Sequence, residues 1–404
     1  MYTSVKGRRD FGLTIEAKPS SRDYAEIIRA TRDSSNDRTA SRLARPEGNL
    51  LGASPSNLLL IGDAGLALQA LAAEAIGTDV HGNVKLCYLD PPYNTGERFT
   101  YYNDNRKSAD WLDDLRSHLT ALKPLLAPDA SVWLHLDDSE QHRARVVLDE
   151  VFGRNAFVST VIWQKRLTRD NRKAFSSMHD YIHVYAPGGP QYWKRVRNGL
   201  VDDGIFTNPD NDPRGPWRSA PMSVQSGHAT QSQFYTVVTP TGVEHRPPPG
   251  RCWTYTAERL AQLDRDGFVY WPKNGDGKPR LKRYANDGNG LAPFTIWSAA
   301  DVGDTSSAKK ALIRQFPGKP VFDTPKPEGL LERIVEIGSN PGELVLDFYL
   351  GSGTTALVAQ KLGRRWIGIE KNQQVVHEFV LPRLAADSDS GKGGTFSLFS
   401  IDGP

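Results

Sequence analysis

The feature that most constrains the fold of this chain is an alternation of buried strands and amphipathic helices. An apolar run ending in an acid predicts a strand over 57–63, and helical periodicity follows over 64–76. A second buried strand is predicted over 84–90, a helix over 111–128 and a third strand over 131–137. Strands and helices in this order are typical of an α/β domain with a parallel sheet.

The same alternation returns in the last part of the chain. Helices are predicted over 327–339 and 354–363, and buried strands over 343–348 and 365–370. Between about 160 and 320 the chain is instead dense in Gly, Pro and aromatic residues, with little helical periodicity. We therefore expect a loop-rich, β-type module inserted between the two halves of one α/β domain.

Charge separates the middle of the chain from its flanks. Residues 161–320 hold 23 Lys and Arg against 14 Asp and Glu, a net charge of +9, while the remainder carries −6. This asymmetry favours a polyanion as the partner of the middle region, although chance clustering of solvated basic residues would give the same numbers.

Several classes of protein are disfavoured by composition. No apolar run reaches the roughly 18 residues needed to span a bilayer, and the basic start MYTSVKGRRDFG lacks the apolar block of a secretory signal. Two cysteines, Cys87 and Cys252, cannot form a disulfide framework, and the nine histidines show no metal-ligand spacing. We expect a cytoplasmic protein that contacts no membrane and holds no metal.

The first motif with chemical meaning is Asp90-Pro91-Pro92-Tyr93, directly after a buried strand. Open α/β sheets bind ligands at the carboxyl ends of their strands. An amine conjugated to an aromatic ring is a poor nucleophile, and acceptors for its N–H groups would localise its lone pair. The Asp90 carboxylate and the Pro91 carbonyl can accept these hydrogen bonds, while Tyr93 offers a face for stacking a base. A rigid turn capped by Asp is the alternative interpretation.

The second motif, LVLDFYLGSGTT at 344–355, combines a strand, a tight glycine turn and a helix start. Gly351 and Gly353 would let the backbone approach a ligand closely, and the helix beginning at Thr354 offers N–H groups to a carboxylate. Glu370 ends the next strand, where it can bind ribose hydroxyls. A glycine-rich turn without a ligand is the alternative.

With these motifs in this order, the chain resembles the S-adenosylmethionine-dependent amino-methyltransferases of DNA. It is most similar to their permuted β group and to the modification subunits of type III restriction systems. The shared stretches run from about 57 to 372 and include DPPYNTG and LDFYLGSGTT. The resemblance implies a Rossmann-like, seven-stranded methyltransferase sheet with circularly permuted motif order, and extrusion of the target base from the DNA. It divides the chain into an N-terminal arm with a short helix (1–50), a catalytic half (51–160), a target-recognition module (161–320) and a cofactor-binding half (321–404).

The resemblance also assigns roles to residues. Asp90, Pro91, Pro92 and Tyr93 match the catalytic tetrapeptide. The positions that match the cofactor site are Asp63, Lys326, Pro327, Asp347, Phe348, Gly351, Gly353, Thr354 and Glu370. The basic residues that suit DNA contact are Lys165, Arg166, Arg169, Lys282 and Arg283. Phe175 or Tyr181 could help to hold the extruded base, with core packing as the alternative.

These observations predict a site-specific DNA methyltransferase that modifies N6 of adenine. The alternative is N4 of cytosine by the same mechanism, since only pocket shape separates the two bases; methylation of RNA or protein is more remote. The resemblance implies double-stranded DNA as partner, a homodimer and a prokaryotic, nucleoid-associated location. The length of 404 residues, short for a type III subunit, leaves a restriction subunit as partner open.

Overall fold

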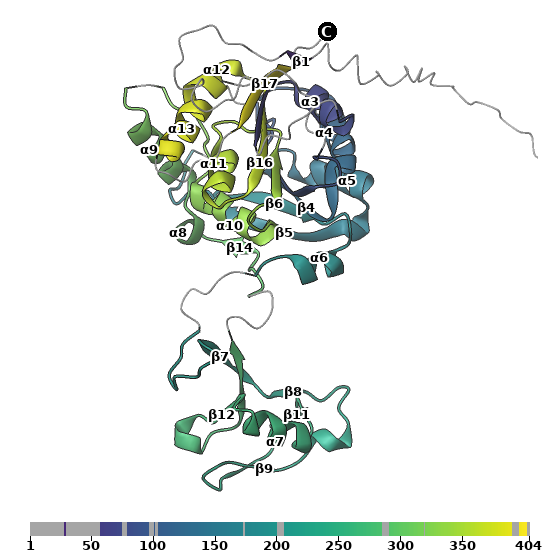
Figure 1. Cartoon of the computed structure of the whole chain (residues 1–404), viewed down its shortest axis with the longest axis vertical. Helices are drawn as coiled ribbons and strands as arrows, with labels where there is room; N and C mark the ends of the chain where they lie inside the picture. Colours follow the sequence, from purple (N-terminus) through teal and green to yellow (C-terminus); the bar gives the residue numbers. More distant parts are fainter. Residues whose placement is uncertain are drawn as a thin grey trace, which may run out of the picture. The chain divides into compact units, whose positions relative to one another are not determined.

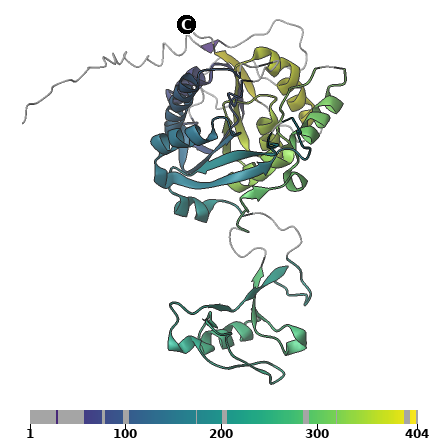
Figure 2. The ribbon, with the colours of Figure 1, turned by 180° about the vertical axis from the view of Figure 1, so that it is seen from behind.

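The computed structural model describes the backbone of 28–29 and residues 57–74, 79–96, 101, 104–172, 174–199, 206–284, 291–318, 320–389 and 396–401. The chain divides into two compact units, drawn in Figures 1 and 2. The first combines residues up to Arg197 with those from Phe294 onward, and the second comprises Asn198–Pro293. The predicted N-terminal arm lies outside the described residues apart from Ile28 and Arg29.

A single mixed sheet organises the first unit. Its strands, in spatial order, are β1 (Ile28–Arg29), β17 (Ser397–Ile401), β2 (Leu58–Gly62), β16 (Arg365–Glu370), β15 (Leu344–Asp347), β3 (Val84–Leu89), β4 (Leu126–Leu136), β6 (His179–Tyr185), β5 (Phe157–Gln164) and β14 (Ile296–Trp297). The strands from β17 to β4 are parallel, and β6 runs antiparallel to both of its neighbours. The α/β class and the permuted order of its halves are thereby confirmed, with β17, β1 and β14 extending the expected seven strands.

Helices cover both faces of this sheet (Figure 1). On one face lie α3 (Ala64–Ala72), α4 (Ser108–Leu122) and α5 (Gln141–Phe152), and on the other α10 (Glu328–Gly338), α11 (Thr354–Lys361) and α13 (Leu381–Asp389). The remaining helices of this unit are α6 (Pro190–Val196), α8 (Ala299–Val302), α9 (Thr305–Gln315) and α12 (Gln373–Val375), with a π-helical turn at Val376–Val380. Every helix in the described ranges is too short or too polar to cross a membrane.

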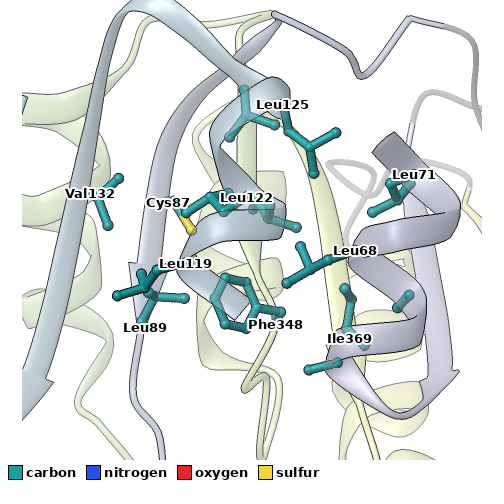
Figure 3. Close-up of a cluster of buried hydrophobic side chains, with 14 of the residues drawn as sticks. Leu68, Leu71, Cys87, Leu89, Leu119, Leu122, Leu125, Val132, Phe348 and Ile369 are labelled. Carbon is teal, nitrogen blue, oxygen red and sulfur yellow. The ribbon is translucent and has the colours of Figure 1, made fainter. Parts of the chain in front are cut away.

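The core between the sheet and helices α3 and α4 is continuous and apolar (Figure 3). Leu68 of α3 and Leu119 of α4 are fully buried against Cys87, Leu89 and other strand residues. Each such leucine contributes about 1.5–3 kcal/mol by leaving water. Phe348, directly after β15, belongs to the same cluster, so the core extends to the carboxyl edge of the sheet and fixes the loops there.

One predicted helix is too long. The pattern over 111–128 predicted a helix to Pro128, whereas α4 ends at Leu122 and residues 126–128 already belong to β4. Pro124 explains the difference, because proline cannot donate the helical hydrogen bond. The chain makes one 3-10 turn at Lys123–Leu125 and then extends.

The second unit is built from short strands and one longer helix. Its elements are β7 (Trp217–Pro221), β8 (Ser223–Gln225), β9 (Val237–Val238), β10 (Glu244–His245), β11 (Arg251–Trp253), α7 (Ala257–Arg265), β12 (Val269–Tyr270) and β13 (Arg280–Tyr284). Strands β12, β13 and β7 form one sheet, and β9–β10 and β8–β11 form two ribbons. A small core around Met222, Trp253, Leu260 and Leu281 holds them together.

The inserted unit differs in extent from the predicted module. The prediction ran over 161–320, but β6 pairs with β4 and β5 pairs with β6 in the sheet of the first unit, which leaves 198–293 as the insertion. The smaller insertion changes which unit carries the positive charge. Residues 161–197 hold eight Lys and Arg against two acids, while 198–293 hold eleven against ten. Most of the basic excess therefore belongs to the first unit.

Candidate functional site

Carboxylate side chains gather at one edge of the main sheet. Strands β2, β16, β15 and β3 are parallel, so their carboxyl ends meet there. An acid stands at or directly after the end of each strand: Asp63, Glu370, Asp347 and Asp90, in the order of the strands. All four line one cavity of about 890 Å³. A ligand that donates hydrogen bonds or carries positive charge would relieve their mutual repulsion.

Most of the residues selected from the sequence line this cavity. They are Asp63, Asp90, Pro91, Pro92, Tyr93, Lys165, Arg166, Lys326, Asp347, Phe348, Gly351, Thr354 and Glu370. Gly353 and Pro327 are not among the lining residues. They directly precede α11 and α10. Arg169 lies in the loop between β5 and β6, and Lys282 and Arg283 lie on β13 of the second unit.

The glycine loop after β15 is held in a fixed shape. Gly351 and Gly353 have φ of +54° and +83°, a region that residues with a Cβ rarely occupy. The Gly351 N–H donates to Glu370 Oε2 at 2.8 Å. From α13, the buried Arg383 guanidinium donates to Ser352 O at 2.8 Å and to Thr354 Oγ1 at 3.0 Å. The loop is therefore shaped before a ligand binds.

Burial sets the protonation of the two central acids. Asp347 accepts hydrogen bonds from the Tyr349 N–H at 2.9 Å and from Thr355 Oγ1 at 2.6 Å. Burial nevertheless raises the pKa of Asp347 to about 7, with the charges of Asp90 and Glu370 adding to the effect. Burial also raises the pKa of Glu370. A cation in the cavity would favour the ionised form of both groups.

The pKa of Asp63 shifts in the opposite direction to those of Asp347 and Glu370. Asp63 begins α3 by accepting from the Gly65 N–H at 3.0 Å, and Lys371 Nζ lies 3.2 Å from its Oδ2. Burial opposes ionisation, but the hydrogen bonds from Lys371 and the helix N–H groups outweigh it and lower the pKa of Asp63. Asp63 is therefore a fixed negative charge at the cavity rim.

The turn after β3 places Asp90 between two partners. Its Oδ1 accepts from the Tyr93 hydroxyl at 3.0 Å, and its Oδ2 lies 2.6 Å from Lys326 Nζ. Lys326 also stands 5.2 Å from the centre of the Tyr93 ring. Behind the turn, Trp111 Nε1 donates to Pro92 O at 2.8 Å. The Asp90 carboxylate is thus oriented by residues from both halves of the permuted domain.

A buried aspartate holds the residues that follow the turn. Asp104 accepts from the N–H groups of Asn94 at 2.7 Å and Thr95 at 3.0 Å. Asn94 adopts φ of +61°, and its side chain donates to Glu140 Oε1 at 3.0 Å. Asp104 was not predicted from the sequence, since nothing in its local pattern shows that its carboxylate points back to residues nine and ten positions earlier.

A second polar group that the sequence analysis did not select lies behind Tyr93. The Tyr93 hydroxyl lies 3.5 Å from Oδ2 of the buried Asp180, and His135 Nε2 lies 3.4 Å from the same oxygen. Lys165 Nζ lies 2.5 Å from Asp180 Oδ1. Burial lowers the pKa of His135, so its ring is neutral at pH 7. Because β6 is antiparallel, its first residues reach the same edge as the ends of the parallel strands, and the sequence does not reveal strand direction.

Two of the predicted DNA contacts have partners within the protein. Lys165 pairs with Asp180 in the cavity wall. Lys282 is almost buried and lies 2.5 Å from Asp210 Oδ2 and 2.8 Å from Asp212 Oδ2. Their neighbours in sequence, Arg166 and Arg283, are exposed. In the pairs Lys165-Arg166 and Lys282-Arg283, the arginine is therefore the residue that is accessible to an external anion such as a phosphate.

Comparison with known protein families shows which family the chain belongs to. The N6_N4_Mtase family, described as DNA methylase, matches residues 84–380. The chain belongs to this family. It is a DNA methyltransferase, and the family uses S-adenosylmethionine as its methyl donor. The predictions of the family, of methyl transfer to DNA and of the cofactor are confirmed.

Relatives include enzymes of two restriction-modification types. The chain is 29% identical over 357 residues to the type II methyltransferase M.EcaI of Enterobacter cloacae, covering 86% of this chain and 72% of that protein. It is 29% identical over 331 residues to the StyLTI Mod subunit, a type III protein of Salmonella typhimurium, covering 74% and 49%. The chain thus spans about half the length of that Mod subunit.

Solved structures resemble the chain more distantly. A putative DNA modification methylase from Thermus thermophilus, complexed with S-adenosyl-L-methionine, is 18% identical with a TM-score of 0.42 and covers 86% of this chain and 99% of that one. The PvuII cytosine-N4-specific DNA methyltransferase is 14% identical with a TM-score of 0.46 and covers 86% and 98%.

Replacing Asp347 with Asn is expected to stabilise the ligand-free protein, and more so at about pH 8 than at about pH 5. The pKa of this carboxyl is about 7 in the folded protein but about 4 in an unfolded chain. The folded state therefore retains the proton between these values and loses stability relative to the unfolded state as pH rises through them. The loss in stability of the wild type is about 4 kcal/mol at pH 8 and about 1.4 kcal/mol at pH 5.

Urea unfolding of both proteins at the two pH values measures this effect. A stability difference between Asp347→Asn and the wild type that is equal at both pH values would contradict it.

Proposed function

We propose that this methyltransferase modifies N6 of adenine in double-stranded DNA, with S-adenosylmethionine as the donor in the cavity at the sheet edge. The observation that carries the proposal is the position of Asp90, which shares one cavity with Asp347 and Glu370 and has Tyr93 beside it. An acceptor for an amine, a surface for a base and a site for an adenosyl group are then within one enclosure.

The residues present fit the donor. Glu370 can accept hydrogen bonds from ribose hydroxyls, while Asp63 stands at the rim as an ionised acceptor. The N–H groups at the start of α11 suit a carboxylate, and Lys326 in the wall suits the same group. The bound donor supplies an electrophilic methyl group on a cationic sulfonium, whose charge suits a cavity lined by four acids.

The target half of the site acts on the amine. Asp90 and the Pro91 carbonyl accept its two N–H groups, which localises the nitrogen lone pair and points it into the cavity. Tyr93 stacks against the base, and its hydroxyl keeps the Asp90 carboxylate oriented through the 3.0 Å bond. Lys326, which holds Asp90 Oδ2 in the ligand-free protein, must share that oxygen with the incoming amine. The nitrogen loses one proton in the reaction, and the Asp90 carboxylate is its first acceptor.

N4 of cytosine is the second candidate, because it is also a ring-conjugated amine and the same acceptors would serve it. Asp at the first position of the tetrapeptide favours adenine in the resemblance on which the proposal draws. Three further proposals rest on resemblance alone. The protein forms a homodimer, its inserted unit recognises the target sequence, and it acts in the cytoplasm of a prokaryote. Association with a restriction subunit is a property named for the Mod relatives.

Incubation of the protein with tritiated S-adenosylmethionine and genomic DNA, with RNA and protein as acceptors in parallel reactions, is expected to place the label in N6-methyl-2′-deoxyadenosine after digestion of the DNA to nucleosides. Asp90→Ala should transfer label at least about a hundredfold more slowly, because it removes the acceptor that activates the amine. Label in N4-methyl-2′-deoxycytidine would establish the second candidate, and label absent from DNA but present in the RNA or protein reaction would overturn the proposal.

Arg283→Gln is expected to weaken DNA binding and to reduce the salt dependence of Kd by about one counterion. The neighbouring Lys282→Gln is the matched control. Because Lys282 is paired with Asp210 and Asp212, its loss should lower the melting temperature of the protein instead.

Fluorescence anisotropy over a range of salt concentrations, with thermal melts of both variants, separates the two effects. Equal salt dependence in Arg283→Gln and the wild type would exclude Arg283 as a phosphate contact.

A further inference from the structure

The loop between β5 and β6 is a preformed hairpin at the rim of the cavity. Directly beyond the last paired residues of the two strands, Lys165 N donates to Met178 O at 2.9 Å. Nearer the tip, Asp170 N donates to Ser176 Oγ at 2.9 Å. These bonds connect the two arms of the loop, residues 165–172 and 174–178, although both arms lie outside the strands.

Two properties of this hairpin suit a nucleic acid. Its cavity side is close to the target half of the site, because Lys165, Arg166, Asp170 and Ser177 all line the cavity. Its outer side is exposed and basic, with Arg166 and Arg169 in the open. The hairpin belongs to segment 161–197, in which Lys and Arg outnumber acids eight to two. Phosphates are therefore attracted to the rim of the cavity.

Phe175 stands on this basic hairpin with 92% of its surface exposed, and Leu167 on the opposite arm is 62% exposed. Core packing of Phe175 is thus excluded in the described structure. Single exposed apolar residues are common and need no explanation by themselves. Here the exposed residue is two positions from Ser177 of the cavity wall, so the Cα atoms of Phe175 and Ser177 are at most about 7 Å apart.

Extrusion of a base leaves a gap in the duplex beside the place where the base enters the protein. Proteins that distort DNA commonly fill such gaps with an apolar wedge, often Phe or Leu. A wedge must be exposed before binding, flanked by basic residues that can contact phosphates, and close to the pocket. Phe175 is exposed, shares its loop with the exposed Arg166 and Arg169, and is two residues from Ser177 of the cavity wall.

We propose that Phe175 is the wedge that enters the DNA stack when the target base is extruded into the cavity, with Arg166 and Arg169 contacting the adjacent phosphates. The partner is double-stranded DNA carrying the target site, and the hairpin is the second DNA surface of the protein besides the inserted unit. The inference rests on the proposed extrusion of a base from duplex DNA.

The test compares Phe175→Ala, Phe175→Trp and the wild type on a duplex containing a site that the wild type methylates. Phe175→Ala should lower kcat/KM on this duplex by about tenfold or more, since one aromatic stack on a base is lost. Phe175→Trp should restore it. With an abasic site opposite the target base, extrusion is already easier, and the loss in Phe175→Ala should fall to about threefold or less.

Phe294→Ala is the matched control. Phe294 is 82% exposed but precedes β14 rather than following it, so it lies away from the carboxyl edge of the sheet. Its removal should leave kcat/KM unchanged. In parallel, 2-aminopurine at the target position should fluoresce more strongly on binding the wild type, with a much smaller rise on binding Phe175→Ala.

The outcomes distinguish this inference from the proposed function. Wild-type activity of Phe175→Ala on the matched duplex would overturn the wedge and leave the methyltransferase proposal intact. An equal loss on the matched and abasic duplexes would also overturn it, because Phe175 would then be a general DNA contact. Absence of any 2-aminopurine signal in the wild type would refute the extrusion on which the wedge depends, whereas absence of DNA methylation by the wild type would refute the proposed function.

Discussion

The structure depends on one electrostatic constraint: parallel strands bring their carboxyl ends to one edge, and four of these ends carry acids. Carboxylates placed together in a partly buried cavity repel one another and lose hydration. The protein offsets this with backbone N–H groups at Glu370 and Asp63 and with lysines at Asp63 and Asp90. For Asp347 the compensation is incomplete, which is why its pKa is raised to about 7. The site is thus less stable alone than with a cationic ligand.

Lys326 couples the two halves of the domain. It lies 236 positions from Asp90 in sequence, yet their side chains are 2.6 Å apart. The segment that leads into α10, which follows the inserted unit, is in this way connected to the turn after β3, which precedes it.

Much of this organisation could be predicted from the sequence because it depends on local patterns. Apolar runs ending in acids identify the strands and place Asp63, Asp90, Asp347 and Glu370 at one edge, and glycine spacing identifies the β15 loop. Asp180 and Asp104 could not be predicted, since their roles depend on an antiparallel strand and on a loop that folds back. Net charge was informative only in part: it could not show that Lys165 and Lys282 are paired internally, nor that most of the basic excess lies outside the inserted unit. The end of α4 was mispredicted because apolar residues after Pro124 suit a helix and a strand equally.

The cavity is divided, in this proposal, between a cofactor half around Glu370 and a target half around Asp90. Calorimetric titration of S-adenosylmethionine into Glu370→Gln and Asp90→Asn tests this division. Glu370→Gln is expected to weaken binding by about tenfold or more, because a charged acceptor is lost. Asp90→Asn should bind the donor within about threefold of the wild type, while transferring no methyl group. Equal weakening of donor binding by both variants would contradict the division.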